Sequence, residues 1–283
     1  MSRYHLALIV PEPRLHGKAF LEVMDTLAWG LEQLGHRVTR AVNSFQKDAT
    51  NIVFGAQLLP VDAQKELPPD TIVYNFDPLR NLSLRDHAIK PEVLHYVTNF
   101  RIWDYSQGNL ESWKALSPKR EVRYVPVGFA PLLCRIAKPS VQDIEVLLYG
   151  TTGQERLQVL HELSHRGFTA VYAAGLFGTA RDELIGRAKI VLNVNYNNFA
   201  KIFEVVRVSY LLANRKAVVA DESADSFIDP DLRPGVKLAL LSQLVDACKL
   251  LFENDAERVR LEETGFAVIR QRDIVRILTE ALR

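Results

Sequence analysis

The stretch from Lys189 to Asp221 constrains the fold of this chain more than any other segment. Ile190 to Val194 is a β-branched apolar run, which is typical of a buried strand. A polar break follows, and then residues 201–214 have the length of about four helical turns. Ala217 to Ala220 is a second short apolar strand. This order predicts a strand–helix–strand unit of a parallel sheet.

The helix expected at 201–214 is apolar on nearly every side, which indicates burial. Three charged residues interrupt it at three-residue steps near its start, namely Lys201, Glu204 and Arg207. Buried charges are costly unless they are paired. One interpretation is an ion pair between Glu204 and Arg207, with Lys201 exposed. The other is a phosphate-bearing ligand at the helix start, where free amides favour an anion.

Composition places the chain among ordinary globular proteins. It has 283 residues, of which 48% are hydrophobic, and 35 basic residues against 34 acidic ones give a net charge of +1. This balance gives no support to a polyanion-binding surface, so nucleic acid is a disfavoured partner. Two cysteines form no metal or disulfide pattern, which favours the cytoplasm. We expect no signal peptide and no transmembrane segment.

The N-terminal half opens with a βαβ pattern. Tyr4 to Val10 is a predicted strand, a helical periodicity follows and ends at Gly35, and Arg37 to Val42 is the next strand. An opening of this kind is the start of a Rossmann-like domain.

The same pattern restarts in the second half. Residues 126–139 are rich in Pro and Gly and form the best linker candidate. A new strand follows from Ile144 to Tyr149. We therefore predict an α/β fold of two Rossmann-like domains, residues 1–131 and 132–283, each a parallel sheet flanked by helices. The two would face each other across a cleft, with ligands at the carboxyl ends of the strands.

Candidate ligand-binding residues of the second half follow its strands. The turn Gly150-Thr151-Thr152-Gly153 opens a helix, which suits a diphosphate or serves merely as a turn. Asn193 and Asn195 share one face of a strand, and Tyr196 comes next. The spacings of a Walker loop and of a dinucleotide fingerprint are missing, so a Rossmann oxidoreductase is disfavoured.

Candidate general bases lie in the first half. His16 is in the loop after the first strand and is either a base or a surface residue. Asp77 and Asp104 follow later strands and are equally plausible as bases or as turn and capping residues. His161 and His165 are spaced to ligate a metal, but without a third ligand a solvated helix face is favoured, and we expect no metal site.

These features resemble the GT-B glycosyltransferases, most closely the bacterial group 1-type enzymes that include the spore-maturation-protein-like branch. The resemblance rests on the two halves and on three segments, which are Tyr124–Pro131, Glu145–Gly150 and the Phe203-Glu204 element. It covers most of the chain. The usual pair of glutamates about eight positions apart is absent here, since the second position falls near Ser209.

The resemblance implies a transferase that moves a sugar from a nucleotide-sugar to an unidentified acceptor. The C-terminal domain would bind the donor and the N-terminal domain the acceptor, with no metal and no cofactor besides the nucleotide-sugar co-substrate. Lys201 and Arg207 would offset charge on the leaving phosphate. Glu204 would accept hydrogen bonds from donor hydroxyls, and His16 or Asp104 would assist the acceptor hydroxyl. Two alternatives stay open: a nucleotide-sugar epimerase on the same fold and a non-catalytic module that binds sugar nucleotides.

Overall fold

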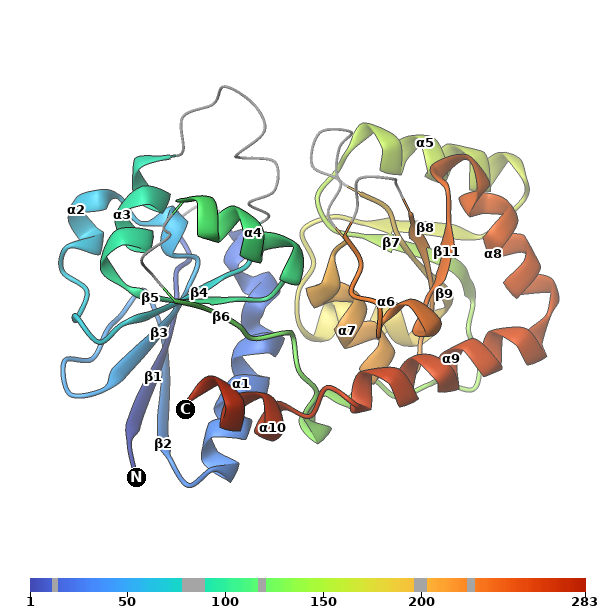
Figure 1. The fold of residues 1–283 in the computed structure, drawn as a ribbon. Coiled ribbons are helices and arrows are strands. Elements are labelled where there is room, and N and C mark those ends of the chain that lie inside the picture. Colours follow the sequence, from blue (N-terminus) through green and yellow to red (C-terminus); the bar gives the residue numbers. More distant parts are fainter. Residues whose placement is uncertain (12–14, 78–89, 117–120, 196–202, 223–226) are drawn as a thin grey trace. The chain divides into compact units, whose positions relative to one another are not determined.

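The computed structural model describes residues 1–11, 15–77, 90–116, 121–195, 203–222 and 227–283 (Figure 1). The chain forms two compact units. The first comprises Met1–Ala130 together with Arg272–Arg283, and the second comprises Pro131–Gln271.

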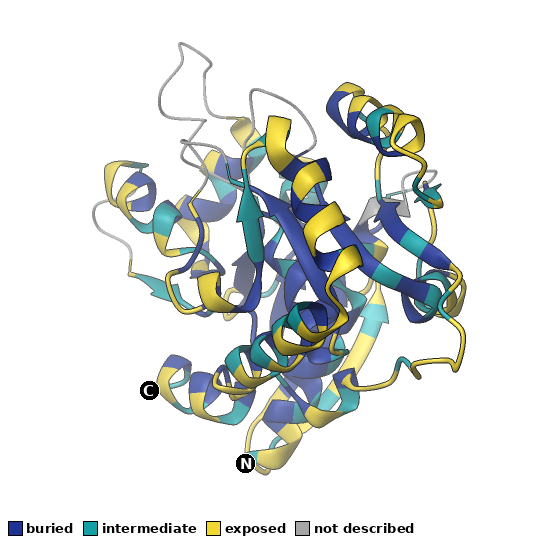
Figure 2. Ribbon diagram, turned by 90° about the vertical axis from the view of Figure 1, so that its right-hand side faces the viewer, coloured by how far each residue is buried: buried dark blue, intermediate teal, exposed yellow. Residues whose placement is uncertain are grey.

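The first unit contains a six-stranded parallel sheet in the order β2-β1-β3-β4-β5-β6. The strands are β1 (Arg3–Leu8), β2 (Arg37–Val42), β3 (Thr50–Phe54), β4 (Ile72–Asn75), β5 (Arg101–Asp104) and β6 (Val122–Tyr124). The helices are η1 (Leu15–Phe20), α1 (Leu21–Gln33), η2 (Ala56–Leu58), α2 (Val61–Gln64), α3 (Pro91–Asn99), α4 (Gln107–Leu116) and α10 (Ile274–Ala281). The central strands are buried on both faces, as a parallel sheet covered by helices requires (Figure 2).

The last helix returns to the first unit. Phe129 N donates to the Arg272 carbonyl over 2.7 Å, and Ile274 N donates back to the Phe129 carbonyl over 3.1 Å. Helix α10 then packs on α1 at Gly30, where a Cβ would lie 2.7 Å from Cδ1 of Leu278. The expected division at 131/132 therefore needs a correction at the C-terminus. Residues 272–283 belong to the first unit, because the apolar face of α10 packs closely against α1 at Gly30.

The second unit contains a five-stranded parallel sheet in the order β11-β10-β9-β7-β8. The strands are β7 (Ile144–Tyr149), β8 (Ala170–Ala173), β9 (Ala188–Asn193), β10 (Ala217–Asp221) and β11 (Lys237–Ala239). The helices are η3 (Pro131–Leu133), α5 (Gln154–His165), α6 (Thr179–Arg187), α7 (Val205–Ala213), η4 (Arg233–Gly235), η5 (Leu241–Gln243), α8 (Leu244–Glu253) and α9 (Asp255–Arg270).

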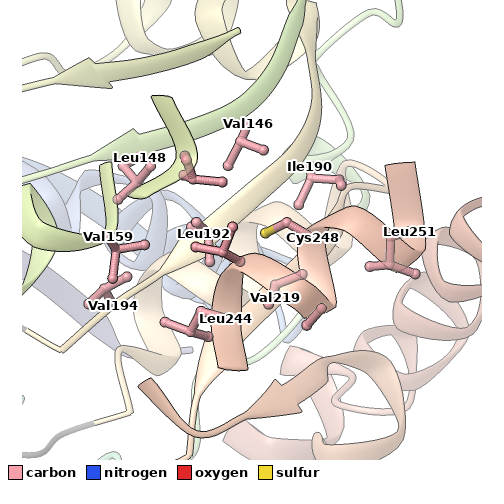
Figure 3. Packing of buried hydrophobic residues seen from close by; sticks show 13 residues of the cluster. Val146, Leu148, Val159, Ile190, Leu192, Val194, Val219, Leu244, Cys248 and Leu251 are labelled. Atoms are coloured by element: carbon pink, nitrogen blue, oxygen red, sulfur yellow. The ribbon is translucent and has the colours of Figure 1, made fainter. Parts of the chain in front are cut away.

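One core of the second unit lies between this sheet and the helices α5 and α8 (Figure 3). Ile190 and Leu192 of the central strand β9 point into it, as do Val194, which directly follows the strand, and Cys248 of α8. Asn193 therefore lies on the opposite face of the strand, because successive side chains of a strand alternate. Val208 and Leu212 of α7 are fully buried.

The strand order places a topological switch point in the second sheet. From β7 the chain first adds β8 on one side and then β9 on the other. Leu148 pairs with Leu192, so Tyr149 and Gly150 end level with Asn193 and Val194. Ligands of open α/β sheets bind outside the carboxyl ends of the strands at such a point.

The predicted strands at Arg37–Val42 and Ile144–Tyr149 coincide with β2 and β7, and the predicted parallel α/β architecture is confirmed. The helix predicted at 201–214 begins later, at Val205. Phe203 is buried and accepts a hydrogen bond from Val205 N over 2.7 Å in a tight turn, so Phe203 and Glu204 precede the helix. Among the described residues, no helix is both long and apolar enough to cross a membrane.

Candidate functional site

Three helices of the second unit, α5, α6 and α7, carry an arginine at their third position, and two of them, α5 and α7, follow the switch-point strands. Helix α5 begins at Gln154 after β7, and its third residue is Arg156. Helix α7 begins at Val205 after β9, and its third residue is Arg207. A cation in the first turn adds to the positive end of the helix dipole, which is unfavourable unless an anion lies nearby. The same unfavourable placement therefore occurs in both helices that follow the switch-point strands, while Arg181 of α6 pairs with its neighbour Asp182.

The Arg156 guanidinium is fixed by backbone carbonyls. Its Nε donates to the carbonyl of Val194 over 2.9 Å, and its Nη1 donates to the carbonyl of Thr151 over 2.7 Å. The side chain is only 3% exposed. These bonds hold the cation at the carboxyl ends of β7 and β9.

The Arg207 guanidinium lies beside the same strand ends. It stacks on the ring of Tyr149, with Cζ 4.9 Å from the ring centroid, and its Nη1 donates to Oδ1 of Asn193 over 3.3 Å. The side chain is 13% exposed. A cation over an aromatic face is attracted by the ring quadrupole.

Glu204, directly before α7, joins the two arginines. One carboxylate oxygen pairs with Nη2 of Arg156 and the other with Nη2 of Arg207. The predicted Glu204–Arg207 ion pair is thus confirmed, and Arg156 is an additional partner. Two cations face one carboxylate in this cluster, so the three side chains together carry a net positive charge.

Gly150 provides the space for both guanidinium groups. A Cβ at this position would lie 2.6 Å from Nη2 of Arg207 and 3.1 Å from Nη1 of Arg156. The φ of Gly150 is +123°, a backbone conformation that favours glycine. The hydroxyl of Tyr172 donates to the Gly150 carbonyl over 3.0 Å and helps to fix the turn.

Asn193 and Asn195 present one donor and one acceptor beside this cluster. Oδ1 of Asn193 accepts from Arg207, and Nδ2 of Asn195 donates to the Asp221 carboxylate over 2.8 Å, so a charged neighbour orients each amide. Within the described part of the chain, Nδ2 of Asn193 and Oδ1 of Asn195 have no hydrogen-bond partner, although both atoms are buried. Such groups cost free energy until they are paired, and a hydroxyl can serve both kinds of group.

The carboxyl end of β5 in the first unit carries a different cluster, centred on the fully buried carboxylate of Asp104. It accepts hydrogen bonds from Nδ2 of Asn75 (2.8 Å), the backbone N of Ser106 (2.8 Å), Nδ2 of Asn109 (3.1 Å) and Nε1 of Trp113 (2.5 Å). Burial raises the pKa of Asp104 to about 6, although the four donors lower it. Because these donors already occupy both carboxylate oxygens, the geometry argues against a direct catalytic role for Asp104.

The same two amides that bond Asp104 also hold the backbone of Asp77. Nδ2 of Asn75 and Nδ2 of Asn109 donate to the Asp77 carbonyl over 2.8 and 2.9 Å. The Asp77 side chain is only partly buried, and this burial raises the pKa of its carboxyl group. Asp104 therefore positions Asp77 through two asparagines.

The structure describes some of the other predicted site residues in full, one only in part and others not at all. Thr151 and Thr152 are exposed, and Gly153 directly precedes α5. His16 lies in η1, and its side chain lies outside the described part. Tyr196 and Lys201 lie outside the described residues altogether.

The sequence predictions missed Arg156 and Asp221. Arg156 follows the Gly150–Gly153 turn, and its unfavourable place in a helix first turn was the available signal. Asp221 is the last residue of β10, and the bond to Asn195 that brings it to the site is a tertiary contact.

No group of three or more His, Cys, Asp or Glu side chains in the described ranges is arranged to hold a metal ion. The Nε2 atoms of His161 and His165 lie 3.0 Å apart, and both residues are exposed.

No protein-family model matches the chain. It is 23% identical over 168 residues to uncharacterized protein L140 of Acanthamoeba polyphaga mimivirus, a match that covers 57% of this chain and 54% of that protein. The chain thus spans about half the length of this curated relative. Since the relative is viral, a bacterial source stays a prediction.

Several solved structures resemble the whole chain. HepE of Anabaena, solved in complex with UDP and glucose, has a TM-score of 0.66 at 11% identity and covers 100% of this chain and 99% of its own. AviGT4, a glycosyltransferase involved in avilamycin A biosynthesis, has a TM-score of 0.57 at 15% identity, with 100% and 96% covered. T4 phage BGT in complex with its UDP-glucose substrate has a TM-score of 0.57 at 14% identity, with 100% and 97% covered. At these identities the likeness shows the fold, which is the GT-B fold with two Rossmann-like domains.

Proposed function

We propose that this protein is a glycosyltransferase that moves a sugar from a nucleoside-diphosphate sugar to an acceptor, with the donor bound by the second unit. One observation carries the proposal. Arg156 and Arg207, each in the first turn of a helix, converge at Gly150 on the switch point of the sheet. The GT-B fold supports it.

The diphosphate of the donor fits the charge of this site. Two guanidinium groups offer forked N–H donors that match phosphate oxygens, and two helix N-termini add to the positive potential. Negative charge grows on the leaving diphosphate as the sugar departs. Fixed cations at that place stabilise the transition state, by several kcal/mol per group as an order of magnitude. We propose that the arginines supply this charge without a metal ion.

Sugar or ribose hydroxyls fit the neutral part of the site. Nδ2 of Asn193 can donate to a hydroxyl, and Oδ1 of Asn195 can accept from one. The carboxylate of Asp221 fixes the Asn195 amide for this task. Tyr196 and Lys201 stay candidates for donor contacts on the strength of the sequence alone.

We assign the acceptor to the first unit, with His16 or Asp77 as the group that takes the acceptor proton. Asp77 qualifies because it follows β4 and has a raised carboxyl pKa, which favours proton transfer near neutral pH. Asp104 acts through Asn75 and Asn109 to hold Asp77. Both cysteines are free, which fits a reducing compartment, and we place the reaction in the cytoplasm.

The test is a set of arginine variants assayed for donor binding. Arg207→Ala is expected to weaken the binding of UDP and UDP-glucose by roughly 10- to 100-fold, because charge-assisted hydrogen bonds are lost. Arg156→Ala is expected to act in the same direction. Arg166→Ala is the matched control, since Arg166 directly follows the same helix, is exposed and pairs with Glu162 and Asp246. Calorimetry measures affinity, and circular dichroism verifies the fold.

The proposal fails if folded Arg156→Ala and Arg207→Ala proteins bind a panel of nucleotide-sugars like the wild type. Product analysis separates the remaining activities. Transfer to an acceptor supports the transferase, a free epimer without acceptor indicates an epimerase, and binding without turnover indicates a non-catalytic module. Assays with EDTA and with added Mn²⁺ test metal independence.

A further inference from the structure

Glu204 occupies the groups that a diphosphate would use. Its two carboxylate oxygens pair with Nη2 of Arg156 and Nη2 of Arg207, one oxygen on each guanidinium. A bridging carboxylate and a bridging phosphate are both anions that accept from guanidinium N–H groups. A diphosphate therefore competes with Glu204 for the same donors.

We propose that Glu204 is a built-in competitor for the diphosphate, and that it leaves at least one arginine when the donor binds. The inference rests on the proposed function of the site. It differs from the sequence-based expectation, in which Glu204 accepts hydrogen bonds from donor hydroxyls.

The carboxylate is the member of the cluster that is able to move. Arg156 is anchored by the carbonyls of Val194 and Thr151, and Arg207 by Asn193 and the ring of Tyr149. The Glu204 side chain is 26% exposed, which is more than either arginine, and the residue precedes the helix. Exchange of anions thus needs a rotation of Glu204 alone, while the guanidinium groups stay in place.

This competition makes the site selective by charge. A nucleoside diphosphate carries more negative charge than its sugar ester, and inorganic pyrophosphate is likewise a dense anion. A carboxylate that stays close to the bound phosphates repels the more highly charged ligand more strongly. Glu204 therefore disfavours pyrophosphate and the nucleoside diphosphate product relative to the sugar-bearing donor, and it assists product release.

The experiment measures inorganic pyrophosphate and UDP binding to the full chain by calorimetry. Glu204→Gln is expected to bind pyrophosphate about tenfold more tightly than the wild type, because a competing charge is lost. The same substitution should raise the affinity for UDP more than the affinity for UDP-glucose. Glu162→Gln is the matched control, since Glu162 also pairs with an arginine but in a half-exposed position on α5. This control should match the wild type.

A folded Glu204→Gln protein that binds pyrophosphate no more tightly than the wild type overturns the inference. Weaker UDP-glucose binding with unchanged pyrophosphate binding supports the hydroxyl-binding role instead. If Glu204→Gln does not fold, Glu204→Asp serves as the second test. Its side chain is one methylene shorter, so its carboxylate bridges both arginines less well. A gain in pyrophosphate affinity supports the competition, and no gain overturns it.

The failure of this inference is distinguishable from the failure of the proposed function. If the binding of pyrophosphate and UDP depends on Arg207 but not on Glu204, only the competition by Glu204 is disproved. If neither ligand responds to Arg156→Ala or Arg207→Ala, the diphosphate site itself is wrong.

Discussion

The carboxyl ends of the two sheets both carry polar clusters, but the clusters differ in what they leave unpaired. In the first unit, the Asp104 carboxylate is surrounded by four neutral donors and has no exposed surface. In the second unit, two arginines share one carboxylate, and two buried amide atoms lack partners among the described residues. A fully satisfied network rigidifies a fold, whereas an excess of charge and unmet polar atoms indicates a ligand.

Asp104→Ala should give the largest effect of a single substitution. It leaves the buried N–H groups of Trp113 and Asn75 without their acceptor, so the free energy of unfolding should fall by about 3–5 kcal/mol. Denaturant titration measures the loss. UDP binding, which belongs to the second unit in our proposal, should persist in the folded fraction.

Asp70→Ala is the control for that change, since Asp70 pairs with Arg101 in the same unit but is largely exposed, and exposed pairs contribute little. An equal loss of stability in both variants would contradict a special role for the Asp104 network.

The next largest effect should be a dependence of the free energy of unfolding on pH that comes from the Asp104 cluster. Burial raises the pKa of Asp104 from an ordinary 3.8 to about 6, so between these values the native protein holds a proton that the unfolded chain has released. The contribution of the Asp104 carboxyl to the free energy of unfolding therefore falls as pH rises through this window, by about 3 kcal/mol in all.

The difference in unfolding free energy between wild type and Asp104→Asn isolates this contribution, since Asp77 titrates in both. A difference that does not change from pH 4 to pH 7 would show that the Asp104 pKa is not raised.

Gly150→Ala should give the smallest of these effects on stability and a specific effect on binding. The φ of +123° makes alanine strained, at a cost of about 1–3 kcal/mol. Its Cβ also displaces Arg207, so UDP affinity should fall by roughly tenfold.

Gly167→Ala separates strain from displacement, because Gly167 also has a positive φ, but a Cβ added there would meet no atom within 4 Å. It should lose stability without losing UDP affinity. Equal UDP affinity in the two alanine variants would argue against the convergence of the guanidinium groups at Gly150.

Much of the fold follows from local patterns in the sequence. The alternation of apolar strands and amphipathic helices predicted both sheets, since a β-branched run such as Ile190–Val194 is stable only when covered on both faces. The candidate site was predicted in part. Gly150 and Arg207 were identified from a turn and from a charge in an apolar helix, but Arg156 was missed, because its helix looks ordinarily amphipathic.

The sequence by itself determined the class of the fold, the place of the strand ends and the presence of charges that need partners. Only the tertiary structure decided which charges meet. Helices α5 and α7 begin far apart in the chain, at Gln154 and Val205, and the crossover order of β7 and β9 brings their first turns together. The structure likewise decided that Asp104 is enclosed and that the last helix returns to α1. The physical reason is that spacing along a chain fixes neighbours within one element, whereas pairing between elements is fixed by sheet order and packing.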